Sequence, residues 1–246
     1  MKNQYVGDVG DYGKYSLLRF LAQNDIAVGV NWYLTEDDST NDGKHISYLG
    51  KPECREYCPE VFDVMRDIIA SGDRNVKAVE DSGVIPGAVF YSDILNTTAY
   101  PWEDRMAIRN EWHSKALKKL GKVDIVFADP DNGTIGSKSA SSKDAEKFTL
   151  LSEIEDFYKQ GKNVVYYCQK ARRNENQWEE KKNEMVGLLP EAKILVLTFR
   201  RGTRRSYIFV VHPDDYIQYR NLIEEFVKNY WKEAGEKSSF MIEDGL

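Results

Sequence analysis

Short apolar runs alternate with longer amphipathic stretches from one end of this 246-residue sequence to the other. Such alternation is typical of successive β-α units around a mostly parallel sheet. The apolar runs predict strands at 26–34, 75–79, 88–94, 123–128 and 163–168. Apolar residues at helical spacing predict helices at 11–23, 59–70, 102–120, 144–160, 174–189 and 215–234. We therefore expect an α/β fold with helices on both faces of the sheet.

The C-terminal third of the chain departs from this alternation. Two apolar runs, 193–199 and 207–212, are separated by a segment too short for a helical crossover, which predicts an antiparallel hairpin. The polar tail after residue 234 is expected to fray or to dock loosely. We expect one domain over 1–246, in which 1–25 contributes to the functional site and 35–74 is a loop-and-helix insertion.

Composition narrows the class of protein. Hydrophobic residues make up 41% and charged residues 30%, which is the balance of a packed globular chain. No apolar stretch approaches the length of a membrane span, and the N-terminus lacks the layout of a signal peptide, so we expect a cytoplasmic protein without membrane contact. The three cysteines, Cys54, Cys58 and Cys168, predict neither a disulfide framework nor a complete zinc site.

Acidic residues follow every one of the first four strands. In an open α/β sheet, ligands bind in the crevice outside the carboxyl ends of the strands. An acidic residue there can accept hydrogen bonds from ribose hydroxyls, and polar residues can hold adenine. Glu80 and Asp93 are the candidates for these two roles. The alternative is that they are ordinary polar residues at loop ends. The full set of strand-end residues is Thr35, Glu36, Asp37 and Asp38, then Glu80 and Asp81, then Ser92 and Asp93, then Asp129, Pro130, Asp131 and Asn132.

The segment D-P-D-N-G at 129–133 is the most informative of these loops. Pro130 fixes its own φ angle and Gly133 permits a reversal, so the loop has one shape. Asp129, Asp131 and Asn132 can hold an amino group that is being alkylated and take its proton. The same oxygen ligands also suit Mg²⁺, and a plain turn after a buried strand is the third interpretation.

An unusual polar segment precedes the first helix. It contains three glycines, two tyrosines, Asp8, Asp11 and Lys14 within nine residues. Asp11 can serve as the N-cap of the helix, but capping needs only one such residue. The remainder indicates close backbone approach to a ligand, with Lys14 offering a cation and Tyr15 a stacking ring.

Three motifs in this order resemble the bacterial 23S ribosomal RNA adenine N6-methyltransferases of the large-subunit methyltransferase J type. The family's G-N-x-x-D-x-x-K-H segment is matched by Gly7, Asp8, Asp11, Lys14 and Tyr15. Its D-P-P-Y loop is matched by Asp129 and Pro130. Its R-R-G turn is matched by Arg200, Arg201 and Gly202, followed by Pro213. The resemblance implies a Rossmann-like methyltransferase fold: a seven-stranded, mostly parallel sheet with a C-terminal antiparallel hairpin and helices on both faces. It also implies S-adenosylmethionine as the cofactor.

The resemblance assigns roles to individual residues. Asp129 takes the position of the family's catalytic aspartate, with Asp131 and Asn132 beside it, and Tyr15 that of a cofactor-contacting histidine. The implied cofactor site comprises Lys14, Tyr15, Thr35, Glu36, Glu80, Ser92, Asp93 and Asp129. The implied substrate site comprises Asp8, Asp11, Pro130, Arg200 and Arg201.

The chain departs from the family at two places. The glycine-rich loop expected after the first strand is replaced by the acidic segment 35–43, which retains only Gly43. Asp131 and Asn132 stand where the family has a proline and the aromatic residue that stacks on the flipped-out adenine. The methyl acceptor is therefore left open as an amine, which includes a nucleic-acid base or a small molecule.

Two alternatives remain at this stage. In the first, a Mg²⁺-dependent nuclease or phosphoesterase uses Asp37, Asp38, Asp129 and Asp131, with Asp8 and Asp11 nearby. In the second, the protein has lost catalysis and binds a nucleotide or a partner. The formal net charge of −6 does not favour long-range attraction of the whole molecule to nucleic acid. Two basic clusters can nevertheless contact phosphates. They are Lys170, Arg172 and Arg173, and Arg200, Arg201, Arg204 and Arg205.

Overall fold

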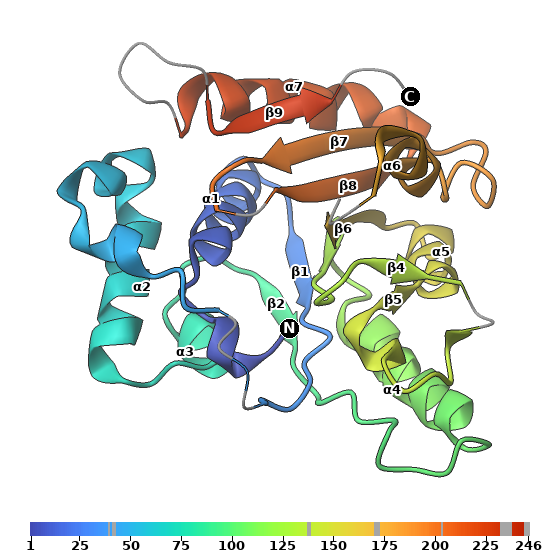
Figure 1. Cartoon of the computed structure of the whole chain (residues 1–246). Helices are drawn as coiled ribbons and strands as arrows, with labels where there is room; N and C mark the ends of the chain where they lie inside the picture. The colour runs from blue at the N-terminus through green and yellow to red at the C-terminus, as the bar shows by residue number, and fades with distance from the viewer. Residues whose placement is uncertain are drawn as a thin grey trace.

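A mixed seven-stranded sheet forms the centre of the computed structural model, which describes residues 1–38, 40, 43–136, 139–169, 173–202, 204–231 and 238–243 (Figure 1). The strand order is β2-β1-β3-β6-β8-β7-β9. The pairings β1 with β2, β1 with β3 and β3 with β6 are parallel, whereas β6 with β8, β7 with β8 and β7 with β9 are antiparallel. The sheet is thus parallel on one side and antiparallel on the other.

The main-sheet strands are short on the parallel side and longer in the hairpin. Their bounds are β1 (Val28–Asn31), β2 (Val89–Tyr91), β3 (Ile125–Ala128), β6 (Asn163–Gln169), β7 (Lys193–Phe199), β8 (Arg205–Val211) and β9 (Phe240–Glu243). A second, two-stranded parallel sheet consists of β4 (Thr134–Ile135) and β5 (Thr149–Leu150).

Helices connect and cover the strands. The α-helices are α1 (Val9–Gln23), α2 (Pro59–Ser71), α3 (Val76–Asp81), α4 (Arg105–Lys119), α5 (Leu151–Lys159), α6 (Glu175–Lys182) and α7 (Tyr216–Asn229). Short 3-10 turns include η1 (Asn3–Tyr5), η2 (Ser47–Gly50), η3 (Pro52–Tyr57), η5 (Ala145–Lys147) and η6 (Pro213–Asp215).

Two hydrophobic cores lie on opposite faces of the sheet. Side chains alternate between the faces of a strand, and β3 sends Ile125 and Phe127 into one core and Val126 and Ala128 into the other. The first core also receives apolar residues of α1, α2, α3 and α7, and the second receives those of α4, α5 and α6. The prediction of helices on both faces is confirmed.

The predicted strand set is wrong at two places, residues 75–79 and the C-terminal tail. Residues 76–79 belong to helix α3 and Asn75 is its N-cap, because the Asn75 side chain accepts a hydrogen bond from Ala78 N at 2.9 Å and starts a helix there. The tail, expected to fray or to dock loosely, supplies β9, whose Phe240 is buried in the first core. The described residues thus hold nine strands in two sheets instead of seven in one, and only half of the main-sheet pairings are parallel.

Helix boundaries also differ from those expected. Helix α1 starts at Val9 because Asp8, and not Asp11, is its N-cap. The predicted helix at 144–160 is a 3-10 turn, strand β5 and the shorter α5; Leu150 N donates to the Glu153 carboxylate at 2.9 Å where α5 begins. Helix α4 starts at Arg105, and α6 ends at Lys182.

The predicted hairpin is confirmed and positions the site. β7 and β8 pair antiparallel, and β8 lies between β7 and β6. The start of β8 therefore lies beside the carboxyl end of the parallel strand β6, with Gln169 opposite Arg205.

No helix among the described residues is long and apolar enough to cross a membrane.

Candidate functional site

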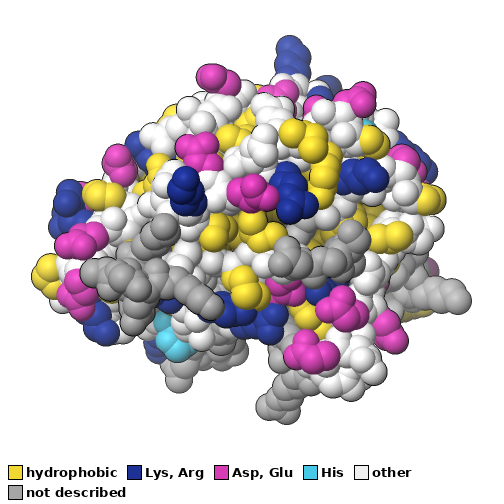
Figure 2. All heavy atoms as spheres, turned by 90° about the horizontal axis from the view of Figure 1, so that it is seen from above, with side chains coloured by type: hydrophobic (Ala, Val, Ile, Leu, Met, Phe, Trp, Pro, Cys, Tyr) yellow, Lys and Arg dark blue, Asp and Glu magenta, His cyan; other side chains and the backbone are white. Residues whose placement is uncertain are grey.

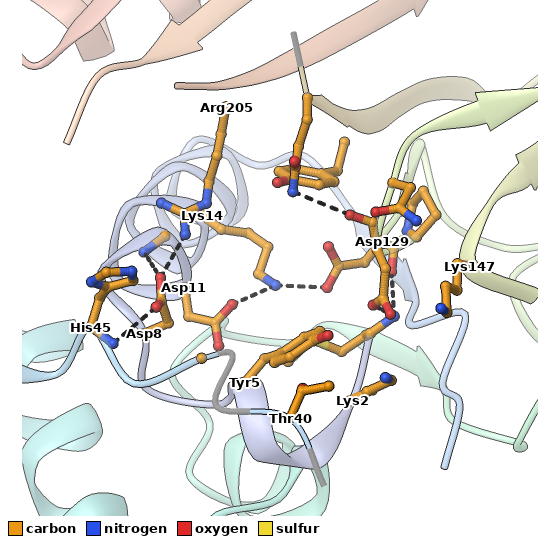
Figure 3. Close-up of a pocket in the computed structure, with 18 of the residues that line it drawn as sticks. Lys2, Tyr5, Asp8, Asp11, Lys14, Thr40, His45, Asp129, Lys147 and Arg205 are labelled. Carbon is orange, nitrogen blue, oxygen red and sulfur yellow. Dashed lines mark hydrogen bonds and ion pairs between the residues drawn. The ribbon is translucent and has the colours of Figure 1, made fainter. Parts of the chain in front are cut away.

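A polar cavity of about 580 Å³ opens at the carboxyl ends of the central strands (Figure 3). Six parts of the chain form its walls: the N-terminal residues 1–5, the start of α1, the loop after β1, the loop after β3, Lys147 of η5, and the meeting point of β6 and β8. Ligand cavities typically measure about 300–1,000 Å³, so this one can hold a nucleoside-sized molecule.

A buried lysine between two aspartates lies at one wall of the cavity. Lys14 Nζ contacts Asp129 Oδ2 at 2.6 Å and Asp11 Oδ1 at 2.7 Å, and Figure 3 shows its side chain extending between the two carboxylates. All three residues are at most 6% exposed. Asp11 and Lys14 are three residues apart on α1, whereas Asp129 directly follows β3. The fold thus brings the N-terminal motif and the D-P-D-N-G loop into direct contact.

The protonation of this cluster follows from its burial and charges. Burial lowers the pKa of Lys14, but the carboxylates of Asp11 and Asp129 outweigh it and hold that pKa well above its usual value. Burial raises the pKa of Asp11, and Lys14 opposes that effect. Lys14 is therefore a fixed cation at neutral pH, which excludes it as an amine nucleophile.

Asp8 anchors the start of α1 and a strand distant in sequence. Its Oδ1 accepts hydrogen bonds from Gly10 N at 2.9 Å and from Arg205 Nη2 at 2.7 Å. A Cβ on Gly10 would lie only 2.4 Å from the guanidinium of Arg205, so the absence of a side chain lets Arg205 cross the first turn of α1. The cavity therefore receives a guanidinium from β8 beside the helix N-terminus.

Backbone and side-chain contacts fix the loop after β3. The Met1 amino nitrogen lies 2.7 Å from Asp131 Oδ1 and donates to the Asp129 carbonyl at 3.1 Å. Asn132 N donates to Lys147 O at 2.9 Å, and Gln169 Nε2 donates to Asp131 O at 3.4 Å. Gly133 adopts φ +98°, which confirms its role as the reversal of the loop.

The cavity brings together many of the residues that the sequence singled out. Those that line it are Asp8, Asp11, Lys14, Asp38, Asp129, Pro130, Asp131, Asn132 and Arg205. Tyr15 lies behind this wall: it is fully buried, its ring is 5.0 Å from Lys14 Nζ and packs edge-on against Trp32.

The other residues assigned to cofactor binding do not line this cavity. Glu80 lies on α3 and accepts a hydrogen bond from Trp32 Nε1 at 2.9 Å, and the Asp93 carbonyl accepts one from Trp112 Nε1. Thr35, Glu36 and Ser92 are also absent from its lining. Their assignment stays a prediction that this cavity does not support.

The two basic clusters are only partly described. Arg200 and Arg201 do not line the cavity; Arg201 stacks over the ring of Tyr57 at 4.5 Å and donates to its hydroxyl. Lys170 and Arg172 lie outside the described residues. On the face drawn in Figure 2, acidic and basic side chains of the described residues are interspersed and form no continuous basic patch.

Several cavity residues were not predicted as site residues. Tyr5, Lys44, His45, Lys147, Tyr167, Gln169 and Tyr207 all line it. Gln169 ends β6, so extending the strand-end argument to the fifth strand would have found it. Tyr207 required the hairpin register, which the sequence does not give. Arg205 was predicted only as a member of a basic cluster, and its place in the cavity required the same register.

The acidic residues of the site are already engaged by cations and amides. Asp38 pairs with Lys2, and Asp37 accepts a hydrogen bond from Gln4 N at 3.0 Å. Across the part of the chain that the structure describes, no three or more His, Cys, Asp or Glu side chains are grouped so as to hold a metal ion. The Mg²⁺ alternative therefore gains no support from this geometry.

Comparison with known proteins leaves the family open. No family model matches the sequence, and no curated protein matches it. Among solved structures, the chain is similar to the crystal structure of a Legionella pneumophila str. Philadelphia 1 protein described by the family model DUF519, at 13% identity and a TM-score of 0.45. That match covers 99% of this chain and 96% of the other. A likeness this distant carries no conclusion about function.

Proposed function

We propose that this protein is an S-adenosylmethionine-dependent methyltransferase that acts on an amine, with Asp129 as the residue that binds the acceptor. The observation that carries the proposal is the buried Asp129 carboxylate, which follows the central parallel strand β3, faces the cavity and is held by Lys14. The insertion of antiparallel β8 between β6 and β7 also agrees with the methyltransferase-like sheet that the sequence motifs imply.

The charges of the cavity lining fit the proposed cofactor. S-adenosylmethionine carries an ammonium, a sulfonium and a carboxylate, and it supplies an activated methyl group when bound. Besides Asp129, the lining carries the carboxylates of Asp8, Asp11, Asp38 and Asp131. Each is paired with a cation of the protein, but an ionised carboxylate has about four lone-pair sites and can still accept an N–H of the ammonium or face the sulfonium. The lining also offers cations for the carboxylate of S-adenosylmethionine, among them Lys44, Lys147 and Arg205. The lining thus carries charges of both signs, which a zwitterionic ligand can use.

The chain's own residues then act by binding and alignment. An ionised carboxylate has two oxygens and about four lone-pair sites, so Asp129 can accept an N–H of the acceptor amine while Oδ2 receives Lys14. Lys14 remains charged and fixes the orientation of that carboxylate. Positioning an amine for in-line attack requires little acid-base chemistry, and the proton released by the methylated amine can pass to Asp129 or to water.

Calorimetric titration with S-adenosylmethionine, and separately with Mg²⁺, tests the proposal. We expect the wild-type protein to bind one S-adenosylmethionine per chain and Mg²⁺ only weakly. Asp129→Asn should keep cofactor binding within about tenfold and reduce methylation of accepted amines by about 10²-fold or more, because the amide is a poorer acceptor of the amine hydrogen. Asp67→Asn is the matched control, because Asp67 lies on α2 with its side chain 73% exposed.

Two outcomes would reject this function. The first is no heat of binding for S-adenosylmethionine up to millimolar concentration together with tight binding of Mg²⁺, which would favour the phosphoesterase alternative. The second is a methylation rate in Asp129→Asn equal to that of Asp67→Asn.

A further inference from the structure

A fully buried ion pair lies behind the loop that forms the cavity wall. Arg109 on α4 donates from Nε to Glu153 Oε1 at 2.7 Å and from Nη2 to Glu153 Oε2 at 2.9 Å. The side chains of Arg109 and Glu153 are 0% and 4% exposed. Arg109 and Glu153 do not line the cavity. Because buried ion pairs are weak stabilisers compared with apolar packing, this pair calls for another explanation.

The remaining donors of Arg109 hold the segment between β4 and α5. Nη1 donates to Ala145 O at 2.8 Å, and Nη2 donates to Phe148 O at 2.7 Å. Glu153 in turn accepts from Leu150 N at 2.9 Å. The pair therefore fixes residues 145–150 at both ends.

That segment holds the D-P-D-N-G loop directly. Asn132 N donates to Lys147 O at 2.9 Å, and Thr149 N donates to Gly133 O at 2.9 Å. Lys147 and Asn132 both line the cavity. Arg109 is thus linked to the loop that begins at Asp129 by hydrogen bonds at both ends of the intervening backbone segment 145–149.

The same ion pair also holds the end of β1. Glu153 Oε2 accepts a hydrogen bond from Tyr33 Oη at 3.1 Å. Tyr33 has φ +45°, a left-handed conformation that is uncommon for a bulky residue and requires support from its surroundings. The two strand ends that flank the cavity, those of β1 and β3, therefore share one anchor.

We infer that Arg109 and Glu153 are positioning residues, whose role is to set the Asp129–Gly133 loop and Lys147 at the cavity wall. What the positioned loop does rests on the proposed function, but the positioning itself does not. The inference concerns local structure, so it can be tested on the free protein.

Amide hydrogen exchange, measured residue by residue, separates positioning from general stability. Arg109→Lys keeps the charge opposite Glu153, but its single nitrogen cannot reach both Ala145 O and Phe148 O. We expect exchange at Asn132 and Thr149 to accelerate by tenfold or more relative to Val196, a core amide of β7. A surface pair on α7, changed as Arg220→Ala with Glu224→Ala, is the control and should leave this ratio unchanged.

A double variant covers the case in which Arg109→Lys does not fold. Arg109→Met with Glu153→Leu removes both charges, a change that buried pairs often tolerate. We expect the same local acceleration at Asn132 and Thr149 and a tenfold or greater loss of affinity for S-adenosylmethionine.

Parallel acceleration of all three amides, or no acceleration at all, would overturn the inference. If the local acceleration appears but S-adenosylmethionine binds neither the wild type nor the variant, the proposed function fails and the positioning role stands.

Discussion

Removal of the Lys14 ammonium should destabilise the protein strongly, because two buried carboxylates then lose the cation between them. The change is Lys14→Met, which keeps the length of the side chain. Lys14 is 4% exposed and contacts Asp129 at 2.6 Å and Asp11 at 2.7 Å. Unit charges about 4 Å apart attract by about 4 kcal/mol at an effective dielectric constant of about 20.

The cost of burying the ammonium offsets part of the two attractions. Removing one partner of a buried pair typically costs about 3–5 kcal/mol. We expect that loss in the free energy of unfolding at pH 7.5. It corresponds to a fall in Tm of about 6–20 °C, at about 2–4 °C per kcal/mol for a chain of this size. Urea unfolding and thermal melting measure it, and Lys77→Met, at a side chain 70% exposed, is the control.

The pH dependence gives the sign of the effect. Burial already raises the pKa of Asp11 from 3.8 despite the presence of Lys14. Without Lys14, burial and repulsion from the Asp129 carboxylate should raise the folded-state pKa of Asp11 further. A carboxyl group whose pKa is higher in the folded than in the unfolded protein stabilises the fold most at a pH below its unfolded pKa, where it is protonated in both states. That stability is lost as the pH rises through the folded pKa and the buried group must ionise. The deficit of Lys14→Met should therefore shrink as the pH falls from 8 toward 4.

A second substitution checks the cause. Asp11→Asn in the Lys14→Met background removes one of the two unpaired charges and should restore part of the lost stability. Two results would refute this explanation. The first is a free energy of unfolding of Lys14→Met within about 1 kcal/mol of the Lys77→Met control, which is less than the loss expected for a broken buried pair. The second is a stability deficit of Lys14→Met that grows at low pH.

The C-terminal strand and the first turn of α1 give two further predictions. Burial raises the pKa of Glu243, but hydrogen bonds from Thr198, Arg204, Trp178 and Lys182 outweigh it and lower the pKa from 4.5 to about 2. Glu243→Gln should therefore lower the free energy of unfolding at neutral pH by about 1–3 kcal/mol relative to the control Glu225→Gln, after allowance for partial exposure. Urea unfolding should show this difference shrinking as the pH falls from 4.5 to 2. A difference that persists at pH 2 would contradict the lowered pKa of Glu243. Gly10→Ala should lower the free energy of unfolding by about 1–3 kcal/mol, because its Cβ would meet Arg205. The control Gly50→Ala, whose Cβ would have nothing within 4 Å, should stay within about 1 kcal/mol of the wild type. Equal Tm values for the two variants would show that Arg205 moves aside freely.

The sequence could place several residues of the cavity at one edge of the sheet because their positions depend on local patterns. A buried strand followed by D-P-D-N-G placed Asp129 at the carboxyl edge of the sheet, and the polar segment around Asp11 and Lys14 stood out by composition alone. The ion pair between Lys14 and Asp129 could not be predicted, since 115 residues separate its members.

Other parts of the fold were misjudged for identifiable physical reasons. Val76 and Val79 indicated a strand, but the cap at Asn75 and the helix-forming residues after it produce α3. The tail appeared too polar to pack, yet Phe240 enters the core and Glu243 meets four donors. Arg109 carried no sequence signal, because its partner Glu153 lies 44 residues away on another helix.

A crystal structure of the wild-type protein soaked with S-adenosylmethionine tests the central claim most directly. We expect one cofactor in the cavity beside Lys14, with its methyl group directed at the space in front of the Asp129 carboxylate. A cofactor bound elsewhere on the sheet, or an unchanged cavity at saturating concentration, would contradict it.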